Sequence, residues 1–173
     1  MKKGLFTILA IGLLAITSLS AAHTRTLRFD VAVDGPSMRG VDFAPLRGNT
    51  FIVNGKIFPG GTLQPGVQQN DPGASGSIGD WLCRATIVND LPTLQPGMPA
   101  LFNTQIMRFN AQDQLTVEGL ESPQVPWVRA ITGGTGDFLG ASGSVRVETI
   151  GTNVTGGFNQ RFVFKILERR DDW

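Results

Sequence analysis

The chain has 173 residues, of which 15 are Lys or Arg and 14 are Asp or Glu, so its formal net charge is only +1. This balance gives no reason to expect a nucleic-acid partner or an anionic membrane surface. One histidine, one cysteine and no tyrosine exclude an intrachain disulfide, a zinc site built from histidines and cysteines, and a nucleophile activated by histidine.

The first 22 residues, MKKGLFTILAIGLLAITSLSAA, have the three-part layout of a secretory signal. Two lysines precede an apolar run from Leu5, and Ser20 and Ala22 occupy the −3 and −1 positions of a cut before His23. Removing 22 of the 173 residues leaves 151, with 13 basic and 14 acidic side chains. We expect an exported protein, periplasmic or extracellular, with a single domain at residues 23–173. No later apolar run approaches the roughly 20 residues of a membrane-crossing helix, so no transmembrane span is expected in the mature chain.

Beyond the signal, apolar residues recur at every second position in short segments, which is the pattern of strands with two different faces. No segment outside the signal has convincing helical periodicity. The eight predicted strands are Leu27–Val33, Phe51–Ile57, Trp81–Val88, Thr104–Phe109, Gln114–Gly119, Trp127–Thr132, Ser144–Ile150 and Phe158–Leu167.

Glycine and proline, 22 and 10 in number, punctuate these strands and form turn sequences such as DGP at 34–36 and NDPG at 70–73. Two longer irregular segments, Pro59–Ser77 and Asn89–Asn103, are predicted to be rim loops of the kind that often gate a pocket. Eight short antiparallel strands in about 150 residues suit a closed β-barrel or a sandwich. A barrel of eight strands has an interior just wide enough for side chains or for one small ligand.

A glycine-rich segment near the C-terminus, TGGTGDFLG at 132–140, has the composition of a dinucleotide-binding loop. That loop needs a helix after it, because the N–H groups at the start of the helix face the pyrophosphate. Here the following residues, ASGSVRV, are predicted to form a strand, and only 33 residues remain after Gly140. The segment is therefore predicted to be a turn between strands.

The same segment, AITGGTGDFLGASG at 130–143, resembles the signature of the allene oxide cyclase and dirigent barrels. Two upstream segments extend the resemblance, LTVEG at 115–119 and WLCR at 81–84, so that it covers Leu27 to Leu167 in total. The resemblance implies an eight-stranded antiparallel barrel, lipocalin-like in shape, whose members commonly form trimers.

The resemblance also implies part of a pocket. Cys83 matches the cysteine of the plant cyclase pocket, Asn54 matches its asparagine, and Pro36 and Ser37 stand in reversed order where the family has Ser-Pro. Phe29 takes the position of the first-strand glutamate, and a valine takes that of the neighbouring asparagine. Dirigent pockets use aspartates and tyrosines, and this chain has no tyrosine. Phe109 is added as an aromatic residue that can supply an apolar lining, so the predicted substrate-binding residues are Phe29, Pro36, Ser37, Asn54, Cys83 and Phe109.

Each of these residues also has a structural interpretation. Cys83 either faces the pocket or is a small buried hydrophobe, and without a histidine beside it we expect no reactive thiolate. Asn54 either holds a ligand oxygen or faces solvent. Phe29 and Phe109 belong to a pocket lining or to the core. Asp30 alternates with Phe29, so it is predicted to point outward into solvent.

Two interpretations are open for the charged residues of the strands. Either they form exposed cross-strand ion pairs, or one acid and one arginine lie inside the barrel, where burial would shift their pKa values. The residues concerned are Arg84, Glu118, Arg146, Glu148 and Arg161.

These features predict a cofactor-free barrel without a metal site that binds a hydrophobic small molecule and steers its cyclisation or isomerisation. The mechanism would select a reactive conformer by shape, and polar groups would stabilise developing charge. The predicted catalytic residues are Asn54 and Glu118, with an arginine as the alternative to Glu118. A non-catalytic exported carrier, or a dirigent-like protein that gives stereocontrol to the product of a partner oxidase, is the alternative. A third possibility is a structural barrel whose interior is filled by side chains.

Overall fold

The computed structural model describes residues 23–38, 47–66, 71–90, 94–95, 98–122 and 126–168. The predicted signal, residues 1–22, and parts of both predicted rim loops lie outside these ranges. No helix among the described residues is long and apolar enough to cross a membrane.

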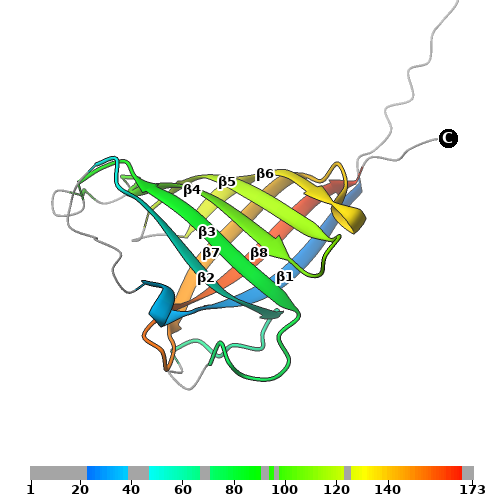
Figure 1. Cartoon of the computed structure of the whole chain (residues 1–173). Helices are drawn as coiled ribbons and strands as arrows, with labels where there is room; N and C mark the ends of the chain where they lie inside the picture. Colours follow the sequence, from blue (N-terminus) through cyan, green and yellow to red (C-terminus); the bar gives the residue numbers. More distant parts are fainter. Residues whose placement is uncertain are drawn as a thin grey trace, which may run out of the picture.

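Eight antiparallel strands close into one barrel, in which every strand pairs with its neighbours in the sequence and β1 pairs with β8 (Figure 1). The predicted fold class and all eight predicted strands are confirmed. The strands are β1 (His23–Val33), β2 (Thr50–Pro59), β3 (Gly79–Ile87), β4 (Leu101–Arg108), β5 (Gln114–Glu121), β6 (Trp127–Thr135), β7 (Ser142–Thr152) and β8 (Phe158–Glu168). Two short 3-10 turns, η1 (Gly35–Met38) and η3 (Gly136–Phe138), lie between them.

The main core lies inside the barrel and is built from alternate residues of each strand, as the period of two requires. Its members include Val31, Trp81, Met107, Val147 and Phe162, all buried. The end of the barrel where β1 begins is lined by aromatic rings. There the Phe29 ring lies 4.9 Å from that of Phe109, whose ring lies 5.3 Å from that of Phe138.

A second, smaller core lies on the outside of the barrel. Ala32, Phe58 and Leu63 are buried there, and Ile150 packs against them. Leu63 belongs to the segment that follows β2, so this segment folds back over the outer face of the sheet. Ile150 lies at a register shift between β7 and β8, which interrupts the alternation of side chains at that point.

Asp30 lies under the same segment, and its predicted exposure to solvent is wrong. The residue is on the outer face, as its alternation with Phe29 requires, but it is completely buried. Its carboxylate accepts hydrogen bonds from the backbone N–H groups of Gly61 and Leu63 at 2.8 and 3.0 Å. It also accepts hydrogen bonds from Arg161 Nε and Nη2 at 2.9 and 3.1 Å. A buried carboxylate needs this set of donors.

The glycine-rich segment forms the turn between β6 and β7, as predicted, and no α-helix follows it. Gly134 has no room for a side chain, because a Cβ atom there would lie 2.5 Å from Phe138 Cβ and 2.7 Å from the Gln114 carbonyl oxygen. Gly136 adopts φ 57°, in the left-handed region that favours glycine. Close packing at Gly134 and the left-handed backbone at Gly136 account for these two glycines.

Candidate functional site

A cluster of polar side chains lies inside the barrel between β4, β5 and β6. Arg129 is its centre: Nη1 donates to Asn103 Oδ1, and Nη2 donates to Gln105 Oε1 at 2.8 Å. Glu121 accepts a hydrogen bond from Asn103 Nδ2, and its Oε2 lies 3.9 Å from Arg129 Nη1. The Arg129 side chain is inaccessible to solvent. The interior thus contains one acid and one arginine, together with amide side chains, within a mainly apolar core.

The alternation of residues along each strand explains why these polar groups point inward. Arg129 lies between Trp127 and Ile131 on the inward face of β6, and all three are buried. Gly119 makes room for the arginine, because a Cβ at this position would lie only 3.1 Å from Arg129 Cγ. One of the two interpretations left open by the sequence, an acid and an arginine inside the barrel, therefore fits the structure. The residues are Glu121 and Arg129, which were not among the candidates named from the sequence.

Burial governs the charges of this cluster. It raises the pKa of Glu121 and lowers the pKa of Arg129, because both charged forms lose water, and the attraction between the two groups only partly offsets this. Gln105 Oε1 also accepts a hydrogen bond from Trp81 Nε1 at 3.3 Å, and Gln105 Nε2 donates to Cys83 Sγ at 3.7 Å. The cluster is therefore a connected network that includes the only thiol.

Several buried polar atoms have no hydrogen-bond partner in the part of the chain that the structure describes. They are Ser122 Oγ, Trp127 Nε1, Arg129 Nε, Asn159 Nδ2 and Gln160 Oε1, and Arg129 Nε belongs to the network itself. Gln160 pairs in register with the core residue Val31 and therefore shares the inward face. A buried polar atom without a partner costs about 1–3 kcal/mol, so these atoms lower the stability of the core unless ordered water reaches them.

The residues predicted to form the site are spread over several parts of the barrel. Phe29 and Phe109 lie in the aromatic end of the interior, and Cys83 is buried in the polar network. Pro36 and Ser37 belong to η1, where Ser37 Oγ accepts a hydrogen bond from the Asn54 N–H at 3.1 Å. Their predicted contact with a substrate stays a prediction.

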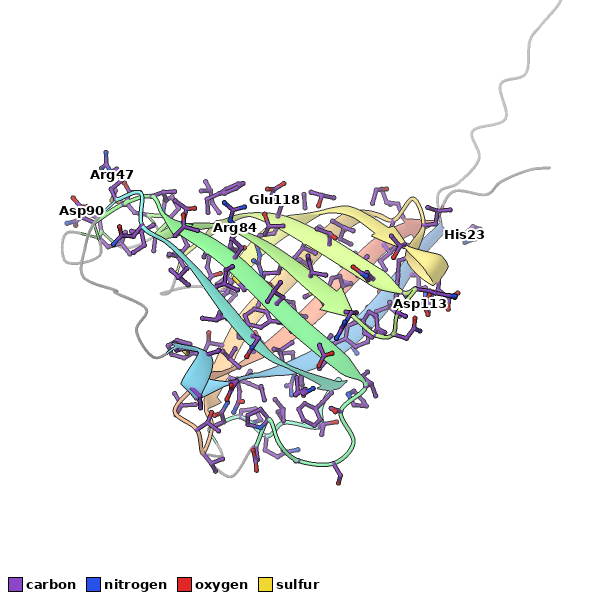
Figure 2. The ribbon with its side chains drawn as sticks, viewed as in Figure 1. His23, Arg47, Arg84, Asp90, Asp113 and Glu118 are labelled. Atoms are coloured by element: carbon purple, nitrogen blue, oxygen red, sulfur yellow. The ribbon has the colours of Figure 1, made fainter. Side chains whose placement is uncertain are left out.

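The two predicted catalytic residues lie on the outer face of the barrel. The Asn54 side chain is exposed. Glu118 accepts a hydrogen bond from Thr104 Oγ1 at 3.0 Å, and Figure 2 shows it near Arg84 on the outside of the barrel. The structure does not bring either residue to the interior network, and their catalytic roles stay predictions.

A groove of about 860 Å³ lies on the outer face of β2, β3 and β4, and Asn54 is among the residues that line it. Three of its charged residues pair with one another: Asp80 lies 2.6 Å from both Lys56 Nζ and Arg108 Nη2. These hydrogen bonds lower the pKa of Asp80. All three side chains are exposed, so these charged groups have both ion-pair partners and contact with solvent. The interior network, where polar atoms lack partners, is the stronger candidate site.

Within the described ranges, no three His, Cys, Asp or Glu side chains lie close enough to hold a metal ion. Glu121 is the one acid of the interior network, and its oxygen is engaged by Asn103. The donor set of the network, with two amides and a guanidinium, suits an organic ligand better than a cation.

No family model and no curated protein matches the chain. Solved structures do match, and their likeness shows the fold. The pterocarpan synthase dirigent protein GePTS1 is 16% identical and covers 95% of this chain and 98% of its own, with a TM-score of 0.56. The pterocarpan synthase dirigent protein PsPTS1 is 17% identical over 87% of this chain and 97% of its own, with a TM-score of 0.54. A pyocyanin demethylase is 18% identical over 81% of this chain and 100% of its own, with a TM-score of 0.50. The chain therefore has the dirigent-type eight-stranded barrel fold.

Proposed function

We propose that this chain is a cofactor-free barrel that binds a hydrophobic small molecule in its interior and steers the cyclisation or isomerisation of that molecule. One observation carries the proposal: a buried arginine network, in which Arg129 Nε has no hydrogen-bond partner among the described residues, lies inside the mainly apolar core of the barrel. The names of the structural neighbours, which refer to pterocarpan and pyocyanin, support a barrel that acts on small organic molecules.

The interior supplies the two elements that such a mechanism needs. Apolar walls, which include Trp81, Met107 and Phe162, would select a folded conformer and hold its reacting atoms together. The Arg129 network would stabilise charge that develops during reaction, and because Asn103 and Gln105 hold the guanidinium in place, little reorganisation is needed.

A non-catalytic carrier, or a dirigent-like protein that gives stereocontrol to the product of a partner oxidase, is the second candidate. The observation that favours it is the engagement of Glu121. The one acid of the network is held by Asn103 and lies near Arg129, so it is poorly placed to exchange protons with a ligand. In this case the pocket would bind and orient without breaking bonds.

A third interpretation is an inert barrel filled by side chains, and the complete burial of the same unpartnered atoms is compatible with it. Each would lower the stability of a sealed core by about 1–3 kcal/mol without any compensation. A bound ligand or ordered water would supply the missing partners.

The test begins with the purified protein and mass spectrometry of any copurified small molecule. This molecule is then incubated with fresh protein and followed for turnover. The double variant R129M/E121Q removes both charges of the interior together and should lose the ligand. The control R146M/E148Q makes the same changes in an exposed pair on β7, where Arg146 Nη2 lies 3.4 Å from Glu148 Oε2, and should keep it.

The outcomes separate the candidates. Turnover supports the enzyme, and binding of an unchanged ligand supports the carrier. Equal ligand retention by the two double variants would contradict a site at the interior network. In the same assay, N54A and E118Q test the predicted catalytic residues, because a loss of turnover with unchanged binding would place them in the reaction after all.

We also propose that the protein is exported and that residues 1–22 are its signal. Expression in a bacterial host followed by N-terminal sequencing of the secreted or periplasmic protein should find His23 as the first residue. An unprocessed N-terminus starting at Met1 would contradict the cleavage.

A homo-oligomer formed through the outer face of the barrel is the proposed assembly, with the trimer implied by the family resemblance as the expected form. Phe102 and Leu120 pair across β4 and β5 and are 41% and 51% exposed, and Val128 on β6 is 65% exposed. Exposed apolar groups of this kind mark association surfaces when they are contiguous. Light scattering should show an oligomer that L120K/V128K converts to a monomer.

A further inference from the structure

The groove on the outer face of the barrel has a row of side chains as its floor. The row starts directly after β1, crosses β2, β3 and β4, and consists of Asp34, Asn54, Leu82 and Ile106. The Asp34 N–H donates to the Asn54 carbonyl oxygen at 2.8 Å. Asn54 pairs in register with Leu82, which pairs with Ile106. The sequence neighbours of these residues lie in the core, so all four side chains share the outer face.

This row has a polar end and an apolar end. The Asp34 carboxylate and the Asn54 side-chain amide have no hydrogen-bond or ion-pair partner among the described residues. At the other end, Leu82 is 41% exposed and Ile106 is partly buried. Because adjacent strands lie about 4.8 Å apart, the centres of the polar pair and the apolar pair are separated by two strand spacings, about 10 Å. The floor therefore fits a ligand with a polar head and a short apolar body.

The charge of the groove decides the sign of that head. Its charged lining residues are Asp34, Lys56, Asp71, Asp80 and Arg108, three acids and two bases, with a net charge of −1. Asp80 pairs with both bases, at 2.6 Å each. The Asp71 carboxylate accepts a backbone N–H at 2.7 Å and has no cationic partner among the described residues. A monocation would neutralise the groove, whereas an anion would add to its negative charge.

The size and openness of the groove also suit a small ligand. Its volume of about 860 Å³ lies within the range of about 300–1,000 Å³ that is typical of small-molecule sites. The segment of Asp71, Pro72 and Gly73, which precedes β3, lines the groove together with the strands. Because Asn54 and Leu82 are exposed, a ligand can reach the floor without any opening of the barrel.

We propose that this groove is a binding site for an organic monocation with a short apolar body. The ammonium group of the ligand donates to the Asp34 carboxylate and to Asn54 Oδ1, and the apolar body covers Leu82 and Ile106. The site lies on the outer face, so the inference goes beyond the proposed function and does not depend on the interior network.

The test compares three probes that share a phenylbutyl body and differ in their head groups: 4-phenylbutylammonium, 4-phenyl-1-butanol and 4-phenylbutyrate. Equilibrium dialysis at pH 7 and low salt measures their affinities for the unchanged protein. The cation should bind about 5-fold more tightly than the alcohol, as expected for an ion pair at a partly exposed carboxylate, and the carboxylate should bind most weakly. High salt should reduce the advantage of the cation and leave the alcohol nearly unaffected.

The variant D34N tests the head-group contact. The Asp34 side chain holds no other described residue, so the variant should fold normally and lose most of the preference for the cation over the alcohol. The matched control is D137N, which makes the same change at an exposed acid of η3 outside the groove and should keep the preference. Persistence of the full preference in D34N would overturn the assigned contact.

The variant L82Q tests the place of the apolar body. It should weaken the binding of all three probes, because the body loses its contact with the floor. The control L139Q makes the same change at a leucine that is 84% exposed and lies outside the groove, and it should bind the probes as the unchanged protein does. Circular dichroism checks that the variants fold, and the three probes on the unchanged protein decide the charge preference even if one variant does not.

The remaining outcomes are equally distinct. Equal binding of cation and alcohol, or tighter binding of the carboxylate, would overturn the assignment to a cation. Binding that L82Q leaves unchanged would place the probes elsewhere on the protein and overturn the groove as their site. Failure of all three probes to bind would also overturn it, and would leave the interior site of the proposed function unaffected.

Discussion

Cys83, the only cysteine of the chain, lies where a thiol is difficult to ionise. Burial raises its pKa to about 12, and the charge of Glu121 adds to this effect. The thiolate is the nucleophilic form of cysteine, so its scarcity at neutral pH makes the residue inert. The surroundings of Cys83 therefore favour a packing role in the network.

Cys83 in the native protein should react with a maleimide at pH 8 at least ~100-fold more slowly than in the urea-unfolded chain, because reaction requires local opening. Mass spectrometry of samples quenched at intervals measures both rates. Native labelling as fast as that of the unfolded chain would contradict the burial and the raised pKa.

Asp30 is the second residue whose environment decides its role. Its carboxylate holds Arg161 of β8 and two N–H groups of the segment after β2 in one place. Because Asp30 is fully buried, the loss of its charge leaves Arg161 without its counter-charge and weakens four hydrogen bonds. Arg161 is itself partly exposed, at 24%, so water recovers some of this loss.

The substitution D30N should lower the free energy of unfolding by about 3 kcal/mol. The matched control D80N removes the charge of an exposed carboxylate that pairs with two cations across the sheet, and it should cost less than about 1 kcal/mol. Urea denaturation followed by tryptophan fluorescence measures both. Equal effects would show that the cover over Asp30 contributes little.

At the scale of elements, the turn between β6 and β7 depends on glycine for two different reasons. Gly134 is crowded by Phe138 and by the Gln114 carbonyl, whereas Gly140 has φ 73° with open space around it. The first position forbids a side chain by volume, and the second only disfavours one by backbone conformation.

The substitution G134A should therefore destabilise the protein by about 3 kcal/mol through overpacking, and G140A by only about 1 kcal/mol through left-handed strain. Thermal denaturation of the two variants and the unchanged protein gives the comparison. A smaller loss in G134A than in G140A would mean that the turn relaxes to accept the methyl group.

The strands could be predicted well because alternation is a local property of the sequence. The predicted ends of the strands were less accurate. β1 begins at His23 and not at Leu27, because its polar, exposed residues 23–26 pair with Lys165–Glu168 of β8. No local pattern announces such an extension, because the partner strand lies at the other end of the chain.

The interior network was missed for a different reason. The charged residues considered for the interior did not include Arg129, although it shares the alternation of Trp127 and Ile131 and can be placed inward on that signal. The burial of Asp30 could not be predicted in this way. It depends on where the irregular segment around Leu63 folds, and that segment has no periodicity.

At the scale of the whole molecule, the buried acid should shape the dependence of stability on pH. Burial raises the pKa of Glu121, so the folded protein keeps this proton over a range in which the unfolded chain has released it. Its contribution to stability is therefore complete below the unfolded value of 4.5 and is lost as the pH rises through the folded pKa.

The free energy of unfolding should therefore decline as the pH rises above 4.5, and E121Q should flatten this decline. Relative to its stability at low pH, the variant should therefore lose less stability near neutrality than the unchanged protein, because its neutral amide avoids the desolvation of the ionised Glu121 carboxylate. Urea titrations at several pH values measure both effects. A decline of the same size in E121Q would assign it to another group.

The sequential order of the strands has a consequence for how the barrel folds. Seven of the eight strand pairings join neighbours along the chain, and only β1 with β8 joins its two ends. The Asp30–Arg161 pair spans 131 positions at this seam, so it forms only when the ring closes. Because long-range contacts form slowly, closure at this seam is the expected rate-limiting step of folding. The segment around Leu63, which covers Asp30, then slows the reopening of the closed barrel.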